Sequence, residues 1–274
     1  MKNKIKKVSG YVFLFIQSLI LLSITILLVL RLTVLDKSFI KNELNKNNYY
    51  KKINDEIKTE MTYYTDQSGF DDSILDNIFS LIDIKNTTNS FISSIYNGET
   101  YTVNTSQIEE KLNNNINKYI ENEHFQIVDQ EQLNKFVKQI ASVYSDEIKL
   151  MGYLDKVCKY IPKLIDFIDY AIVVLFALFV LLLILNEKLI KRRDYSVILY
   201  TSGFIILFII IGFRSSIDIK NLLIYSKTIS NTFISIIKYL FNVYLLISLI
   251  YIGVGLIIDI LKKDKKRRHK KAII

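Results

Sequence analysis

Four long stretches without a charged side chain set the strongest limit on how this 274-residue chain can fold. They occupy residues 8–30, 170–186, 195–213 and 239–258. A bilayer core of about 30 Å is crossed by about 20 apolar residues in a helix, and only a helix satisfies its own backbone polar groups over such a run. The sequence therefore predicts four transmembrane helices, at 8–31, 167–186, 195–213 and 239–259.

The first apolar stretch also has features of a secretory signal peptide, because Lys2, Lys4, Lys6 and Lys7 precede it. Its 23 residues exceed the usual apolar region of a signal peptide, and the following "LVLRLTVLD" contains no small-residue cleavage site. We therefore expect an uncleaved membrane anchor.

Lysine and arginine are distributed unequally over the segments that join these helices. The N-terminus 1–7 has four, the turn 187–194 has four, and the tail 260–274 has eight. Outside the long segment 32–166, the opposite side has five. Because basic residues remain on the cytoplasmic side of a membrane, both termini are expected there, and the basic net charge of +9 is a topology signal rather than a sign of nucleic-acid binding.

The segment 32–166 is consequently expected outside the cytoplasm, as is the shorter loop 214–238. The long segment carries 15 lysines and 21 acidic residues, and it is long enough to form one domain with its own core. The abundant Ile, Lys, Asn and Tyr favour an AT-rich bacterial genome, which would place the protein in a bacterial plasma membrane.

Apolar residues within 32–166 recur at helical spacing, which predicts an all-α domain inserted between the first two transmembrane helices. A helix over about 36–65 is expected first, followed by a second marked by Ile74, Ile78 and Ile82 after an Asp71/Asp72 cap. A short third helix around 91–96 should stop at Gly98. The stretches "SQIE" (106–109) and "DQEQ" (129–132) predict capping boxes that start two more helices.

Enzyme chemistry is disfavoured by the residue inventory. The two histidines, His124 and His269, lie on opposite sides of the predicted membrane, and Cys158 is the one cysteine. Neither a Cys/His metal site nor a nucleophile beside a base is suggested by any spacing. We therefore expect no catalytic residue, metal or cofactor.

The segment "IPKLIDFIDY" places Asp166 and Asp169 at the outer end of the second transmembrane helix. Two explanations are open. The carboxylates could stabilise a helix start behind Pro162, where the positive end of the helix dipole lies. Alternatively, boundary charges pair across a helix bundle, which predicts that Asp169 pairs with Arg31, Arg214 or Lys238.

The second explanation extends to a candidate interhelical charge rim, in which each of the four helices contributes an ionisable residue at the same level. Its members are Arg31, Asp166, Asp169, Arg214, Asp218 and Lys238. A transport path beside Asp169, with Gln17 and Asn242 as polar lining, is the alternative function that this rim allows. The remaining polar residues within the spans are expected to make helix–helix contacts.

The cytoplasmic tail is the other charged feature. Anionic lipid headgroups attract basic residues close to a membrane surface, so a lipid contact is predicted for Lys262, Lys263, Lys265, Lys266, Arg267 and Arg268. Together, these features indicate a non-enzymatic, multi-pass envelope protein that contacts the lipid bilayer and presents 32–166 to another envelope protein, with a small transporter or permease component as the alternative.

Overall fold

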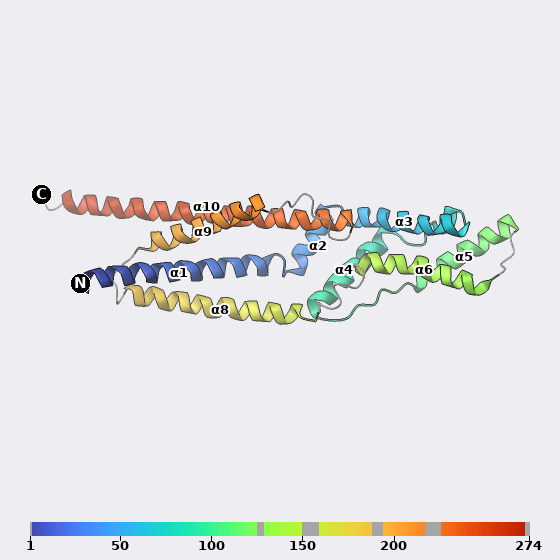
Figure 1. Ribbon diagram of the computed structural model, residues 1–274, viewed down its shortest axis with the longest axis horizontal. Coiled ribbons are helices and arrows are strands. Elements are labelled where there is room, and N and C mark those ends of the chain that lie inside the picture. The colour runs from blue at the N-terminus through green and yellow to red at the C-terminus, as the bar shows by residue number, and fades with distance from the viewer. Residues whose placement is uncertain (1, 125–128, 150–158, 188–193, 217–225, 272–274) are drawn as a thin grey trace. The chain divides into compact units, whose positions relative to one another are not determined.

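The computed structural model describes residues 2–124, 129–149, 159–187, 194–216 and 226–271, with side chains described from residue 10 to residue 263. These residues form helices and contain no strand (Figure 1). Four of the helices are long and apolar enough to cross a membrane. The all-α class and the four predicted spans are thereby confirmed.

The spanning helices are longer than the apolar runs that predicted them. They are α1 (Lys2–Leu32), α8 (Ile161–Leu185), α9 (Tyr195–Ser216) and α10 (Lys227–Lys271). The largest difference concerns α10, because residues 227–238, which were expected in a loop, form its first three turns. The basic segment up to Lys271 continues the same helix.

The chain divides into two compact units. Unit 1 comprises residues 1–36, 165–222 and 233–274, and it contains most of the four spanning helices. Unit 2 comprises residues 37–164 and 223–232. The first turn of α10 is therefore part of unit 2.

Unit 1 is held together by apolar and small residues. Leu22 of α1 and Ile206 and Ile210 of α9 form a buried cluster. Gly203 of α9 allows a close approach of α10, since a Cβ atom there would lie 3.0 Å from the carbonyl oxygen of Ser248. Small residues at helix contacts of this kind are typical of membrane bundles.

Unit 2 is a helical domain around one hydrophobic core. Its elements are α2 (Lys37–Lys46), α3 (Tyr49–Ser68), the short 3-10 helix η1 (Asp72–Leu75), α4 (Leu81–Asn97), α5 (Ser106–Glu123) and α6 (Gln130–Lys149). The predicted apolar faces supply the core, and Ile57, Leu112, Ile116 and Ile140 are fully buried.

Two of the helix predictions for this unit were wrong in detail. The helix expected over 36–65 is broken between α2 and α3, where Asn48 has a left-handed backbone with φ 52°. The helix expected around Ile74–Ile82 is absent: Asp71 caps only η1, and Ile82, in the first turn of α4, is 69% exposed. The predicted helix at 91–96 is the second half of α4.

Two of the predicted helix ends are confirmed and one is wrong. Gly98 is confirmed as the C-cap of α4, with φ 73°. Asp129 caps α6, and its Oδ1 accepts from the backbone N–H groups of Glu131 and Gln132. At α5 the N-cap is Thr105 instead of the expected Ser106. The Thr105 side chain makes no capping hydrogen bond, and Asn104 Oδ1 accepts from the backbone N–H of Ser106. A complete capping box occurs at Ser80 and Asp83 instead.

Candidate functional site

Asp169 of α8 forms an ion pair with Arg31 of α1. The distance from Arg31 Nε to Asp169 Oδ1 is 2.7 Å, and the two side chains are 33% and 49% exposed. Arg31 is one of the three cations expected as partners. A half-exposed pair of this kind contributes on the order of 0.2–1 kcal/mol in water, so it aligns α1 with α8 rather than dominating their association.

The helix-start explanation for Asp166 and Asp169 does not hold. Helix α8 begins at Ile161, with Pro162 in its first turn, and that turn contains no acidic residue. Asp166 and Asp169 fall in the second and third turns. Because the dipole effect fades beyond the first turn, it does not account for either carboxylate.

The structure does not bring the other members of the predicted charge rim together in its described part. Asp166, Arg214 and Lys238 are exposed, and neither an ion pair nor a hydrogen bond links them within the described part of the chain. Asp218 lies outside the described residues. The rim is therefore represented by one pair, Arg31–Asp169.

The basic tail is helical, and two of its six candidate lipid contacts have described side chains. Lys262 Nζ lies 3.8 Å from Asp194 Oδ1 within unit 1, and Lys263 is exposed. Lys265, Lys266, Arg267 and Arg268 belong to α10, but their side chains lie outside the described part.

Polar residues within the spans make contacts between helices. Asn186 Nδ2 donates to Gln17 Oε1 at 3.4 Å, and both side chains are almost fully buried. Ser202 Oγ lies 2.9 Å from the carbonyl oxygen of Ser18. Asn242, in contrast, is exposed on α10. The residues proposed to line a transport path therefore lie in separate environments.

Unit 2 contains a contact that sequence analysis missed. The Oε1 atom of Glu56, on α3, accepts from the backbone N–H of Thr228 at 3.2 Å and from its hydroxyl at 2.7 Å. Thr228 is the second residue of α10, so Glu56 caps a helix from a distant part of the chain. Ile229, the next residue, packs against the hydrophobic core of the same unit.

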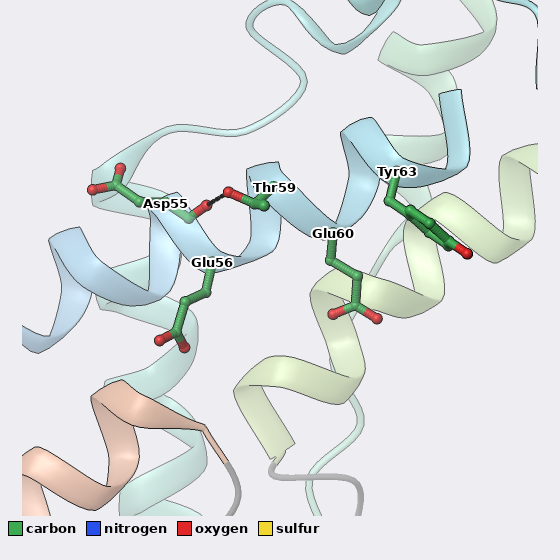
Figure 2. A pocket seen from close by; sticks show the side chains of 5 residues that line it. All are labelled: Asp55, Glu56, Thr59, Glu60 and Tyr63. Carbon is green, nitrogen blue, oxygen red and sulfur yellow. Dashed lines mark hydrogen bonds between the residues drawn. The ribbon is translucent and has the colours of Figure 1, made fainter. Parts of the chain in front are cut away.

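Figure 2 shows that the Glu56 carboxylate points toward the start of α10, drawn in salmon. Glu60, one turn further along α3, lies beside a shallow cavity that Asp55, Glu56, Thr59, Glu60 and Tyr63 line. Among the described residues, no three His, Cys, Asp or Glu side chains are grouped as metal ligands. On this acidic surface, Glu56 attaches the start of α10, and the other acidic side chains of α3 lie around it.

A second cavity of about 480 Å³ in unit 2 is polar and contains a lysine. Lys41 of α2 faces the polar side of α4, and Nζ donates to Ser93 Oγ at 2.8 Å. Ser93 Oγ in turn donates to the carbonyl oxygen of Asn89. The segment Glu99–Tyr101, which follows the Gly98 cap, completes the wall.

Burial shapes the electrostatics of this cavity. Partial burial lowers the pKa of Lys41, and the neighbouring ammonium of Lys37 lowers it further. The Tyr50 hydroxyl donates to Asn89 Oδ1 at 2.8 Å. Burial raises the pKa of Tyr50, and this bond opposes the rise. The Tyr50 hydroxyl does not line the cavity itself, but it holds Asn89, which does.

The sequence carries a faint signal for this cavity. Asn86, Asn89, Ser93 and Asn97 recur at helical spacing and form a polar stripe on α4, but nothing in the neighbouring sequence shows that Lys41 faces it.

In comparisons with protein-family models, with curated proteins and with solved structures, this chain matched none.

Proposed function

We propose that this chain is a non-enzymatic, multi-pass membrane protein that presents unit 2 on the extracytoplasmic side of a bacterial plasma membrane, where the unit binds a partner. The observation that carries the proposal is the construction of unit 2. Residues 37–164 lie between two spanning helices in the sequence, and they fold around a hydrophobic core of their own. A loop that only connects two spans does not need such a core.

The contact between Glu56 and Thr228 supports the four-span threading on which this proposal depends. Residue 56 follows the first span and residue 228 follows the third. The two segments meet on the same side of a membrane only if α8 and α9 together cross it an even number of times. One crossing by each helix satisfies this condition, and the excess of Lys and Arg at the termini and in 187–194 favours placing unit 2 outside.

The surface of unit 2 favours binding over catalysis. It combines a polar cavity around Lys41 with an acidic surface on α3, and loops and helices that display such groups are common recognition surfaces. Transport would require Gln17, Asn242 and Asp169 to share a path. Gln17 contacts Asn186 and Asp169 contacts Arg31, so we do not extend the proposal to transport.

The orientation is tested by single-cysteine labelling in a Cys158→Ser background. Lys111→Cys, exposed on α5, should react with a membrane-impermeant maleimide in intact cells. Lys263→Cys, exposed on α10, should react only after permeabilisation. The reverse pattern would invert the orientation and refute an extracytoplasmic role.

Partner binding is tested by placing a photo-crosslinking amino acid at exposed sites in living cells. Tyr63 and Lys111 sample unit 2, and Phe208, which is 70% exposed on α9, samples the spans. Adducts of discrete mass are expected from the unit 2 sites. Adducts from Phe208 alone would show that the spans, rather than unit 2, carry the interaction.

A further inference from the structure

The polar cavity in unit 2 has an unusual balance of donors and acceptors. The ammonium group of Lys41 carries three N–H donors, and one of them is used by Ser93. Lys41 forms no ion pair with any residue that the structure describes. Lys41 is partly buried, and the desolvation of a charge is normally offset by a partner.

The neighbouring side chains add further donors. Asn89 accepts from Tyr50 through Oδ1, which leaves both Nδ2 hydrogens for another group. Asn86, Ser90 and Asn97 also line the cavity, and the described contacts do not occupy their side chains. On this side of the cavity, α2 therefore offers one positive charge and α4 offers several neutral donors.

The remaining wall differs in chemistry. Glu99 and Tyr101, from the segment that follows α4, also line the cavity. The Glu99 side chain is an acceptor, suited to hydroxyl groups of a ligand. The Tyr101 ring is partly buried and packs near Phe91, with ring centroids 6.1 Å apart, so it forms a fixed apolar wall. These two groups suit the hydroxylated, weakly apolar face of a sugar-like molecule.

We propose that this cavity binds the phosphate or carboxylate of a small hydroxylated molecule, with Lys41 as the charge partner and the amides of α4 as hydrogen-bond donors. The inference rests on the proposed function, since it names the chemistry that unit 2 recognises. Hydrogen bonds between a charged group and a donor are stronger than neutral ones, so the anionic group should supply most of the affinity and Glu99 should orient the hydroxyls.

The test uses the purified full-length protein in nanodiscs of zwitterionic lipid, with calorimetry as the readout. Glucose 6-phosphate and gluconate are the anionic hydroxylated probes, inorganic phosphate is the anion alone, and glucose is the uncharged probe. Glucose 6-phosphate should bind more tightly than inorganic phosphate, and glucose should bind least. Equal binding of glucose and glucose 6-phosphate would overturn the proposal.

The decisive variant is Lys41→Gln, with Lys51→Gln as the matched control. Lys51 is an exposed lysine of α3 in the same unit that does not line the cavity. Loss of a charged hydrogen bond should weaken glucose 6-phosphate binding at least about tenfold in Lys41→Gln, while Lys51→Gln should stay within about twofold. An equal loss in both variants would show non-specific charge attraction and would refute the site.

A second variant keeps the proposal testable if Lys41→Gln does not fold. Asn86→Ala removes one exposed neutral donor of α4 and should weaken binding about three- to tenfold without changing the melting temperature. Unchanged binding in Asn86→Ala, together with misfolding of Lys41→Gln, would count against the site.

Two further experiments identify the source of the anion and distinguish failure of this inference from failure of the proposed function. Nanodiscs that contain phosphatidylglycerol should compete with glucose 6-phosphate if lipid headgroups are the natural source of the anion, and should leave its binding unchanged if a free ligand is the source. If the purified wild-type protein binds no anionic probe, this inference is refuted. If crosslinking of unit 2 nevertheless persists in Lys41→Gln cells, the proposed function still stands. Absence of crosslinking with intact probe binding would do the reverse.

Discussion

Glu56 makes polar contacts with the first turn of α10, so Glu56→Ala should weaken the attachment of this turn. The backbone N–H and the hydroxyl of Thr228 both donate to Glu56 Oε1, at 3.2 and 2.7 Å. Loss of a helix N-cap costs about 0.5–2 kcal/mol, and hydrogen bonds to a charged acceptor are worth about 1.5–3 kcal/mol. Because Ile229 remains packed against the core, we take about 2 kcal/mol as the expected loss for the variant.

Hydrogen exchange measured by mass spectrometry reports this loss directly. Exchange of protected amides follows the free energy of local opening, so 2 kcal/mol corresponds to about 30-fold faster exchange in a peptide that spans residues 228–236. Peptides from α5 should exchange as before, because the core that buries Leu112 and Ile116 is not touched by the substitution.

Glu60→Ala is the matched control for this experiment. Glu60 lies one turn further along α3, lines the same shallow cavity (Figure 2), and forms no hydrogen bond with a described residue. Its removal should leave exchange at 228–236 within about twofold, a margin below the value of one capping bond. Equal acceleration by both variants would show that the charge of α3, rather than the cap, holds α10, and no acceleration by either would refute the attachment.

Two further pairs of substitutions, each a test variant with its control, probe the packing of the two units. Ile57→Ala removes a fully buried side chain from unit 2 and should destabilise it by about 2–5 kcal/mol, whereas Ile82→Ala, at a site that is 69% exposed, should stay within about 0.5 kcal/mol in the same denaturation assay. In unit 1, a Cβ atom at Gly255 would lie 2.8 Å from the ring of Tyr200, while Gly253 faces open space. Gly255→Ala should therefore lower the melting temperature in detergent and Gly253→Ala should not; equal effects would contradict the packing of α9 against α10.

The features that could be predicted from the sequence are those that short segments determine alone. An apolar run must be helical in lipid whatever surrounds it, which is why all four spans were found. Gly98 and Asp129 are similar, since a left-handed C-cap and an N-cap depend on a few neighbouring residues. The break at Asn48 was missed because the apolar spacing that predicted the helix begins only at Ile53, and spacing does not record a local change of backbone conformation.

The features that could not be predicted depend on contacts between distant segments. The start of α10 at Lys227 lies twelve residues before the apolar run, and the contacts that accompany it come from Glu56 and from the core of unit 2. A hydropathy profile detects only the span itself. The cavity around Lys41 has the same origin, because the polar stripe of α4 becomes a binding surface only when α2 places an ammonium group against it.

The partner of Asp169 shows how register decides among chemically equal candidates. Arg31, Arg214 and Lys238 were equivalent in charge and predicted depth. A second contact joins Gln17 of α1 to Asn186, the residue that directly follows α8. Fourteen residues separate Gln17 from Arg31 and seventeen separate Asp169 from Asn186, about 21 and 26 Å of helix at 1.5 Å per residue. Two antiparallel helices with nearly equal spacings can satisfy both contacts at once. Because burial makes an amide costly to leave without a hydrogen bond, the Gln17–Asn186 contact favours the same register of α1 and α8 that brings Arg31 to Asp169.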